Sequence, residues 1–141
     1  MNLNYKKIGF INGCFDILHL GHLKMIQYCR KYCDYLIVGI DSDKMIKKTK
    51  GAHRPFNNEK NRKFFLENIK GVDKVFIFNS HQLLTEKLKK IKPDIMIVGI
   101  EYKDKKVIGD EFAKELKFFE KVDGYSTTKI IQDIIDRGQV Y

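Results

Sequence analysis

Residues 7–32 of the chain read KIGFINGCFDILHLGHLKMIQYCRKY, and this stretch decides the fold. The short apolar run Lys7–Asn12 is typical of a buried strand, and His22–Tyr32 has the apolar spacing of a helix. Between them lies a turn that contains Gly13 and Gly21. The stretch therefore predicts a strand, a turn and a helix, which is the repeating unit of parallel α/β folds.

The rest of the chain repeats this alternation. Four further apolar runs predict strands at Tyr35–Asp41, Lys74–Phe78, Asp94–Gly99 and Leu116–Val122. Helices are predicted at Asn58–Asn68, at His81–Ile91, as a short piece at Asp110–Lys114 and at Thr127–Arg137. We expect one α/β, Rossmann-like domain over residues 1–141, with a five-stranded parallel sheet and helices on both faces. The segment Lys47–Asn57 combines four cations with Gly51 and Pro55, and it is predicted to be a mobile basic loop.

Composition narrows the possible functions. The longest apolar runs are far shorter than the roughly 20 residues that cross a bilayer, so no membrane span is expected. The N-terminus lacks a signal-peptide pattern, and three cysteines make no disulfide framework, so we expect a cytoplasmic protein. A net charge of +9 favours nucleic acid or phosphorylated small molecules as partners. Lysine-rich segments are equally typical of a solvated surface, so charge alone does not decide between them.

His19 and His22 indicate a phosphate site. Three residues apart, they project to the same side of one helical turn, and Gly21 lets a ligand approach the backbone. The turn lies at the carboxyl end of a strand, where α/β sheets bind ligands, and at the positive end of a helix dipole. A zinc site and a pair of structural histidines are the alternatives. Cys14 has no base partner in the sequence, and it is interpreted as a loop thiol and not as a nucleophile.

Two motifs make the family recognisable. Residues 13–22, GCFDILHLGH, and residues 123–131, DGYSTTKII, resemble the two signatures of the cytidylyltransferase-like nucleotidyltransferases. Both occur once, in the family's order. Residues 47–55 resemble the family's basic loop, and Arg62 resembles the arginine that follows this loop in the family. Residues 93–102 resemble the family's fourth strand and the loop that leaves it. The resemblance therefore covers nearly the whole chain.

Within this family the chain looks most like the heptose-1-phosphate adenylyltransferase domain of ADP-heptose synthesis. Glycerol-3-phosphate cytidylyltransferase is the neighbouring possibility. Cys14 and residues 122–124, VDG, favour the heptose type, whereas Lys121 stands where the cytidylyl enzymes carry arginine. Glu101 replaces an aspartate that is usual in both groups, and the Gly-Gly turn common before the fifth strand of heptose enzymes is missing. These departures concern the base and the acceptor, and not the type of reaction.

The resemblance implies the roles of the site residues. The residues expected to act in catalysis are His19, His22, Lys47 and Lys50. Those expected to bind the nucleotide are Gly13, Cys14, Phe15, Gly21, Gly99, Glu101, Lys121, Gly124, Ser126, Thr127 and Thr128. Those expected to bind the acceptor are Asp16, Asp41, Arg54, Arg62, Tyr102 and Lys103. Asp16 and Asp41 are equally interpretable as turn or helix-capping residues.

The implied reaction joins an NTP to a phosphorylated sugar or polyol and releases pyrophosphate, with Mg²⁺ or another divalent cation as cofactor. The metal ligands are not apparent from the sequence. ATP is favoured over CTP, and a homodimer is expected. Two other hypotheses stay open: a nucleic-acid-binding α/β module, which explains neither the histidines nor the STT motif, and a catalytically silent nucleotide sensor.

Overall fold

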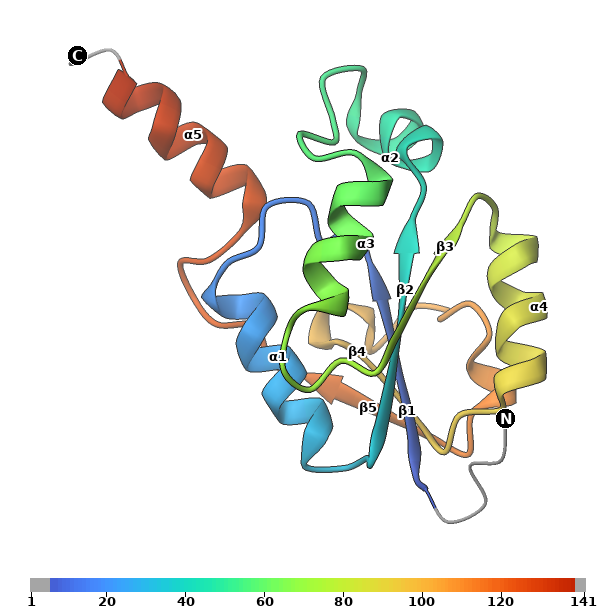
Figure 1. The fold of residues 1–141 in the computed structure, drawn as a ribbon. Coiled ribbons are helices and arrows are strands. Elements are labelled where there is room, and N and C mark those ends of the chain that lie inside the picture. Colours follow the sequence, from blue (N-terminus) through green and yellow to red (C-terminus); the bar gives the residue numbers. More distant parts are fainter. Residues whose placement is uncertain (1–5, 139–141) are drawn as a thin grey trace.

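Five apolar runs of the sequence form the strands of one parallel sheet (Figure 1). The computed structural model describes residues 6–138. The strands are β1 (Ile8–Gly13), β2 (Tyr35–Asp41), β3 (Lys74–Phe78), β4 (Ile95–Gly99) and β5 (Glu115–Phe119). Their order in the sheet is β3-β2-β1-β4-β5, and all four pairings are parallel. The predicted Rossmann-like sheet is confirmed, and its order changes direction at β1, where such sheets bind ligands.

Helices cover both faces of the sheet. They are α1 (Leu20–Arg30), α2 (Asp43–Lys50), α3 (Glu59–Glu67), α4 (His81–Ile91) and α5 (Thr127–Gly138), with short 3₁₀ turns η1 (Ile100–Tyr102) and η2 (Asp110–Phe112). Figure 1 shows α1 and α3 together on one side and α4 on the other. Helix α5 extends away from the sheet, and its Ile134 is 62% exposed. No helix within residues 6–138 has the length and apolar character needed to cross a bilayer.

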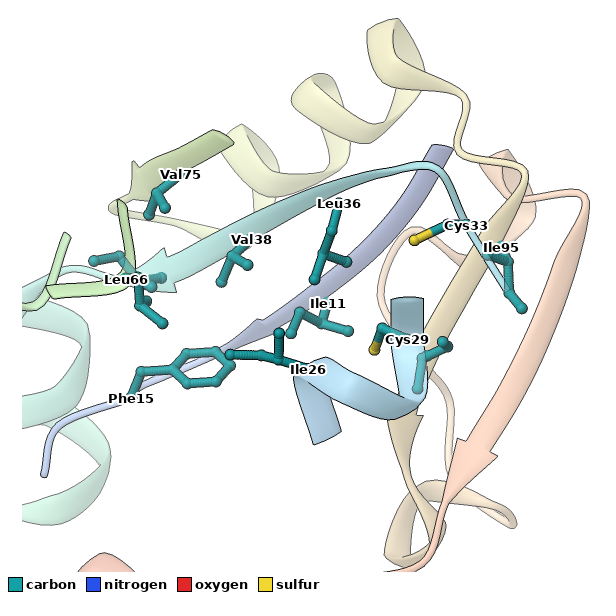
Figure 2. Packing of buried hydrophobic residues seen from close by; sticks show 12 residues of the cluster. Ile11, Phe15, Ile26, Cys29, Cys33, Leu36, Val38, Leu66, Val75 and Ile95 are labelled. Atoms are coloured by element: carbon teal, nitrogen blue, oxygen red, sulfur yellow. The ribbon is translucent and has the colours of Figure 1, made fainter. Parts of the chain in front are cut away.

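Two clusters of buried side chains hold these layers together, because successive strand residues point to opposite faces of the sheet. Figure 2 shows one cluster, in which Ile26 and Cys29 of α1 point toward Ile11 and Leu36 of the strands. The other cluster lies under α4 and includes Leu84, Leu88, Phe10, Ile37 and Met96. Cys29 and Cys33 are buried free thiols, as expected of core residues.

The segment Lys47–Asn57 differs from its prediction as a single loop. Its first four residues form the last turn of α2, whose N-cap is Ser42: the Ser42 hydroxyl accepts a hydrogen bond from the Met45 amide at 3.3 Å. The basic loop is therefore shorter than predicted and starts at Gly51. Strand β5 is also shorter than predicted, since it ends at Phe119 and not at Val122.

Candidate active site

A cavity of about 760 Å³ opens at the carboxyl ends of the strands. Its wall includes Gly13 after β1, Asp41 at the end of β2 and Gly99 at the end of β4. The N-terminal residues of α1 and α5 complete it. The predicted site residues that line it are Gly13, Cys14, Phe15, Asp16, His19, Gly21, His22, Asp41, Lys50, Arg54, Gly99, Glu101, Tyr102, Lys121, Ser126, Thr127 and Thr128.

The two histidines lie one on the other at the start of α1. Their ring centroids are 3.8 Å apart. His19 is the N-cap: its Nδ1 accepts a hydrogen bond from the Gly21 amide at 3.1 Å, and the Nδ1 of His22 accepts one from the His19 amide at 3.2 Å. Because both Nδ1 atoms are acceptors, each neutral ring carries its proton on Nε2.

Burial sets the charge of this pair. It lowers the pKa of His19, and burial together with the neighbouring His19 and Lys50 lowers the pKa of His22 to about 4. Both rings are therefore neutral at pH 7 in the free protein. They offer hydrogen-bond donors to a ligand without adding two positive charges.

The second motif lies beside the first, although more than 100 residues separate them in the sequence. The Ser126 hydroxyl accepts a hydrogen bond from the Lys129 amide at 3.0 Å and so caps the N-terminus of α5. The Thr127 hydroxyl donates to the Ile17 carbonyl at 3.2 Å and so ties α5 to the turn before α1. The Tyr125 ring stacks near the His19 ring, with centroids 6.3 Å apart. Two helix N-termini therefore meet at one cavity, an arrangement that favours anions.

Asp41 presents a carboxylate to the same cavity. The Cys14 thiol donates to its Oδ2 at 3.6 Å. Burial raises the pKa of Asp41, opposed by Cys14, Arg62, Lys50 and His81. Burial raises the pKa of the Cys14 thiol, and the negative charge of Asp41 raises it further. A raised pKa agrees with the interpretation of Cys14 as a loop thiol and not as a nucleophile.

Asp16 holds the loop that follows α2. Its carboxylate accepts hydrogen bonds from the amides of Phe56 and Asn57, both at 2.8 Å, and its side chain is 1% exposed. Arg54 Nε lies 3.6 Å from Asp16 Oδ2 and is buried without a hydrogen-bond partner among residues 6–138. Of the two interpretations of Asp16, the structure favours the turn residue over a ligand of the acceptor.

The expectation that Arg62 binds the acceptor is wrong in this structure. Its side chain is fully buried, and it donates to the carbonyls of Cys14 (2.9 Å), Asp41 (2.8 Å) and Asn57 (2.9 Å) and to the carboxylate of Asp43 (2.8 Å). The guanidinium has no free face for a ligand. Arg62 instead fixes the ends of β1 and β2, from which Cys14 and Asp41 reach the cavity.

Three more predicted residues lie outside the cavity wall. Lys47 and Lys103 are exposed and do not line the cavity. On α2 it is Lys50, and not Lys47, that reaches the cavity wall. Gly124 is also outside, and its positive φ of 84° shapes the turn before α5. Glu101 and Lys121 both line the cavity, and they form an ion pair at 3.0 Å.

The structure adds wall residues that the sequence analysis missed. One is Tyr125, which directly precedes the STT motif. Another is His81, which follows the end of β3; its position at the carboxyl end of a strand could have marked it as a wall residue. Lys106 comes from an irregular segment and had no such signal. No group of three or more His, Cys, Asp or Glu side chains that could hold a metal ion occurs within residues 6–138.

The chain is similar to a known family and to several known proteins. The family model described as cytidylyltransferase-like matches residues 10–133. The chain is 46% identical over 129 residues to the bifunctional protein HldE of Aliarcobacter butzleri (strain RM4018) and 44% identical over 131 residues to that of Helicobacter pylori (strain G27). These matches cover 92% and 93% of this chain but 27% and 28% of the relatives, so the chain spans about a quarter of their length.

A solved structure shares the fold. The lipopolysaccharide core biosynthesis protein of Thermoplasma volcanium GSS1 matches 84% of this chain and 99% of its own, with a TM-score of 0.66 and 26% identity. The family model covers both the histidine turn and the STT turn, which lie together at the cavity in this structure. The chain therefore belongs to the cytidylyltransferase-like family.

Proposed function

We propose that the protein is a nucleotidyltransferase that transfers NMP from an NTP to a phosphorylated sugar and releases pyrophosphate. One observation carries the proposal: the stacked pair His19–His22 and the N-terminus of α5 face the same cavity. Neutral imidazole donors and two helix N-termini suit a triphosphate, whose negative charge is spread over several oxygens. The family membership supports the same reaction type.

In the proposed reaction an oxygen of the acceptor phosphate attacks the α-phosphorus of the NTP. The bond from that phosphorus to the α–β bridging oxygen breaks, and pyrophosphate leaves with the electron pair. A phosphate monoester has a second pKa near ~6, so the nucleophile is already ionised and needs no general base. The protein has to align two anions and stabilise the charge that develops on the leaving group.

The roles follow from position. The Nε2 protons of His19 and His22 would donate to oxygens at the α-phosphate. The Ser126 hydroxyl and the free amides at the N-terminus of α5 would hold the β- and γ-phosphates, since the Thr127 hydroxyl is already used on Ile17. Lys50, at the end of α2, adds a cation to the same wall.

The acceptor would occupy the part of the cavity near Asp41. Three carboxylates line the wall. Asp16 accepts hydrogen bonds from backbone amides and Glu101 pairs with Lys121, whereas Asp41 accepts a hydrogen bond only from the Cys14 thiol. The Asp41 carboxylate can therefore accept further hydrogen bonds from sugar hydroxyls. Arg54 lines the same cavity, which supports a role for this arginine in binding the acceptor phosphate.

The ADP-heptose type is favoured over the glycerol 3-phosphate type, because the chain is 44–47% identical to bifunctional HldE proteins. Lys121 and Glu101 would contact the base, since they pair at the cavity wall beside the exit of β4. A base edge that pairs with them would separate ATP from CTP by ~10²-fold or more.

Mg²⁺ is proposed as the cofactor. The donor set fits an ion that arrives with the triphosphate, because Mg²⁺ is usually held by one or two carboxylates and substrate phosphates. Asp41 is the wall carboxylate available for it, and the ion would neutralise phosphate charge. The proposed location is the cytoplasm, where NTPs are made, and the proposed assembly is a homodimer.

The test is pyrophosphate release with ATP, CTP, GTP and UTP, each combined with heptose 1-phosphate or glycerol 3-phosphate. We expect ATP with heptose 1-phosphate to give the highest kcat/KM. The variant Lys121→Ala, measured beside the wild type, reports on the choice of base. If CTP is preferred and Lys121→Ala abolishes the preference, the adenylyl type is wrong. If no pair releases pyrophosphate, the proposed reaction is wrong.

A further inference from the structure

The cavity extends over both faces of the sheet at the carboxyl ends of the strands. One part lies beside the N-termini of α1 and α5 and holds His19, His22 and Ser126. The other part, the α4 lobe, lies beside α4 on the opposite face (Figure 1). Its floor is apolar and consists of wall residues from the buried cluster under α4, namely Phe78, Leu84, Val98 and Val107. The α4 lobe therefore offers room for a ligand group away from the histidine pair.

Three polar side chains from separate segments of the chain line the α4 lobe. Asp41 ends β2 and lies in register with Phe78, the last residue of β3. His81 begins α4, three residues after Phe78. Lys106 directly precedes Val107, which is buried in the cluster under α4. A carboxylate, an imidazole and an ammonium group therefore share the rim of one apolar space.

The polar atoms of His81 and Lys106 are available to a ligand. Burial raises the pKa of Asp41, and His81 is among the groups that oppose this rise, so the imidazole lies near the carboxylate. Within residues 6–138, however, the side chains of His81 and Lys106 form no hydrogen bond and no ion pair. Both side chains are exposed, and both line the cavity. They support no element of the fold through polar contacts.

The position of His81 in the sheet sets the size of a ligand that can reach it. Strands β1, β2 and β3 are neighbours, and neighbouring strands lie about 4.8 Å apart, so the end of β3 is about 10 Å from the end of β1. The histidine pair follows β1, and His81 follows β3. Bonded carbons are about 1.5 Å apart, so a three-carbon polyol ends within about 5 Å of its phosphate. A sugar ring with exocyclic carbons extends roughly twice as far.

We propose that His81 and Lys106 bind the hydroxyl groups of a sugar acceptor at the end far from its phosphate, and so select a sugar phosphate over a shorter polyol phosphate. The inference rests on the proposed function and names two residues that set the choice of acceptor. A hydroxyl both donates and accepts hydrogen bonds. The Asp41 carboxylate accepts, the Lys106 ammonium donates, and the His81 imidazole can do either. The apolar floor of the α4 lobe lies under these groups and suits the C–H groups of the ring.

The experiment compares acceptor kinetics of the wild type, His81→Ala and Lys106→Ala. Pyrophosphate release is measured with the preferred NTP at saturating concentration and heptose 1-phosphate varied. Each substitution removes hydrogen bonds to the far hydroxyls, so each should raise the KM for heptose 1-phosphate by ~5-fold or more. The kcat and the KM for the NTP should stay within about twofold of the wild type, because neither residue contacts the reacting phosphates. Circular dichroism checks that both variants fold.

Two matched controls replace residues of the same types outside the cavity wall. His53 and Lys90 are also exposed, and neither lines the cavity. His53→Ala and Lys90→Ala should keep the wild-type KM for heptose 1-phosphate. Losses as large as those of His81→Ala and Lys106→Ala would show that any lost cation has this effect, and would overturn the inference.

A shorter acceptor separates contact with the far hydroxyls from contact with the phosphate. Glycerol 3-phosphate is measured by its inhibition constant against heptose 1-phosphate. His81→Ala and Lys106→Ala should change this constant by less than about twofold, because a three-carbon chain ends before it reaches them. Equal losses with both compounds would overturn the inference, and so would an unchanged KM for heptose 1-phosphate in both variants.

Calorimetric titration of heptose 1-phosphate distinguishes a failure of this inference from a failure of the proposed function. If the wild type releases no pyrophosphate, the proposed reaction is wrong. If it still binds heptose 1-phosphate, and His81→Ala and Lys106→Ala weaken that binding by ~5-fold or more, the α4 lobe is a sugar site as inferred. A wild type that does not bind heptose 1-phosphate would overturn the inference.

Discussion

Replacing Arg62 by lysine tests the central support of the site. The guanidinium makes four hydrogen bonds of 2.8–2.9 Å while fully buried, and their acceptors come from three separate segments of the chain, at residues 14, 41–43 and 57. Lysine keeps the charge but carries its donors on one nitrogen, so it cannot reach all four acceptors. Breaking a buried charge network of this kind typically costs about 3–5 kcal/mol. We expect Arg62→Lys to lower the free energy of unfolding by that amount.

The assay is urea unfolding followed by circular dichroism, with Arg30→Lys as the matched control. Arg30 also pairs with an aspartate, Asp73, at 2.7 Å, but both side chains are about a third exposed. Exposed pairs contribute about 0–1 kcal/mol, so the control should lose less than about 1 kcal/mol. If Arg62→Lys loses no more than Arg30→Lys, burial of the guanidinium does not support the site and the reasoning fails.

Four further predictions concern the cavity. His19→Ala and His22→Ala should each lower kcat by ~10²–10³-fold while the variants fold normally, as measured by steady-state pyrophosphate release. A variant with near-wild-type kcat would exclude that histidine from the mechanism. The pKa of His22 is about 4 in the folded chain against 6.5 in the unfolded chain, so protonation favours the unfolded chain. Stability should therefore fall by about 2.5 kcal/mol as pH drops from 6.5 to 4, and His22→Gln should show a smaller drop in urea titrations. Lys50→Ala should reduce kcat/KM far more than Lys47→Ala, since Lys50 alone of the two lines the cavity, and equal losses would contradict this placement. Asp16→Asn should speed tryptic cleavage after Lys50 by loosening the loop that Asp16 holds, whereas an unchanged digestion rate would show that the loop is held by other contacts.

The sheet could be predicted because each strand is a continuous apolar run in the sequence. Tyr35–Asp41 and Lys74–Phe78 match the predicted bounds at both ends, since apolar runs rich in Ile, Val and Phe stop at polar residues. Helix α2 could not be predicted in the same way. It has eight residues, four of them lysines, and only Met45 and Ile46 are apolar, too few for a periodic pattern. Its one usable signal was Ser42, a good N-cap residue.

The two motifs that line the cavity could also be predicted, because each is a continuous stretch of sequence. The residues that hold these motifs in place could not be predicted. An arginine in a sequence is ordinarily a surface residue, and nothing local distinguishes Arg62, which is fully buried, from Arg54, which lines the cavity. That difference arises from contacts with Cys14 and Asp41, which are 48 and 21 residues away in the sequence.

The capping of α1 by its two histidines has a consequence for how the protein responds to acid. A neutral ring whose proton is on Nε2 can take up a second proton only on Nδ1, the atom that accepts the amide of Gly21 in His19 and the amide of His19 in His22. Protonation and the helix cap therefore compete for the same lone pair. A proton that charges either ring therefore breaks one of the hydrogen bonds that cap α1, so acidification weakens the cap in the same event that changes the charge of the ring.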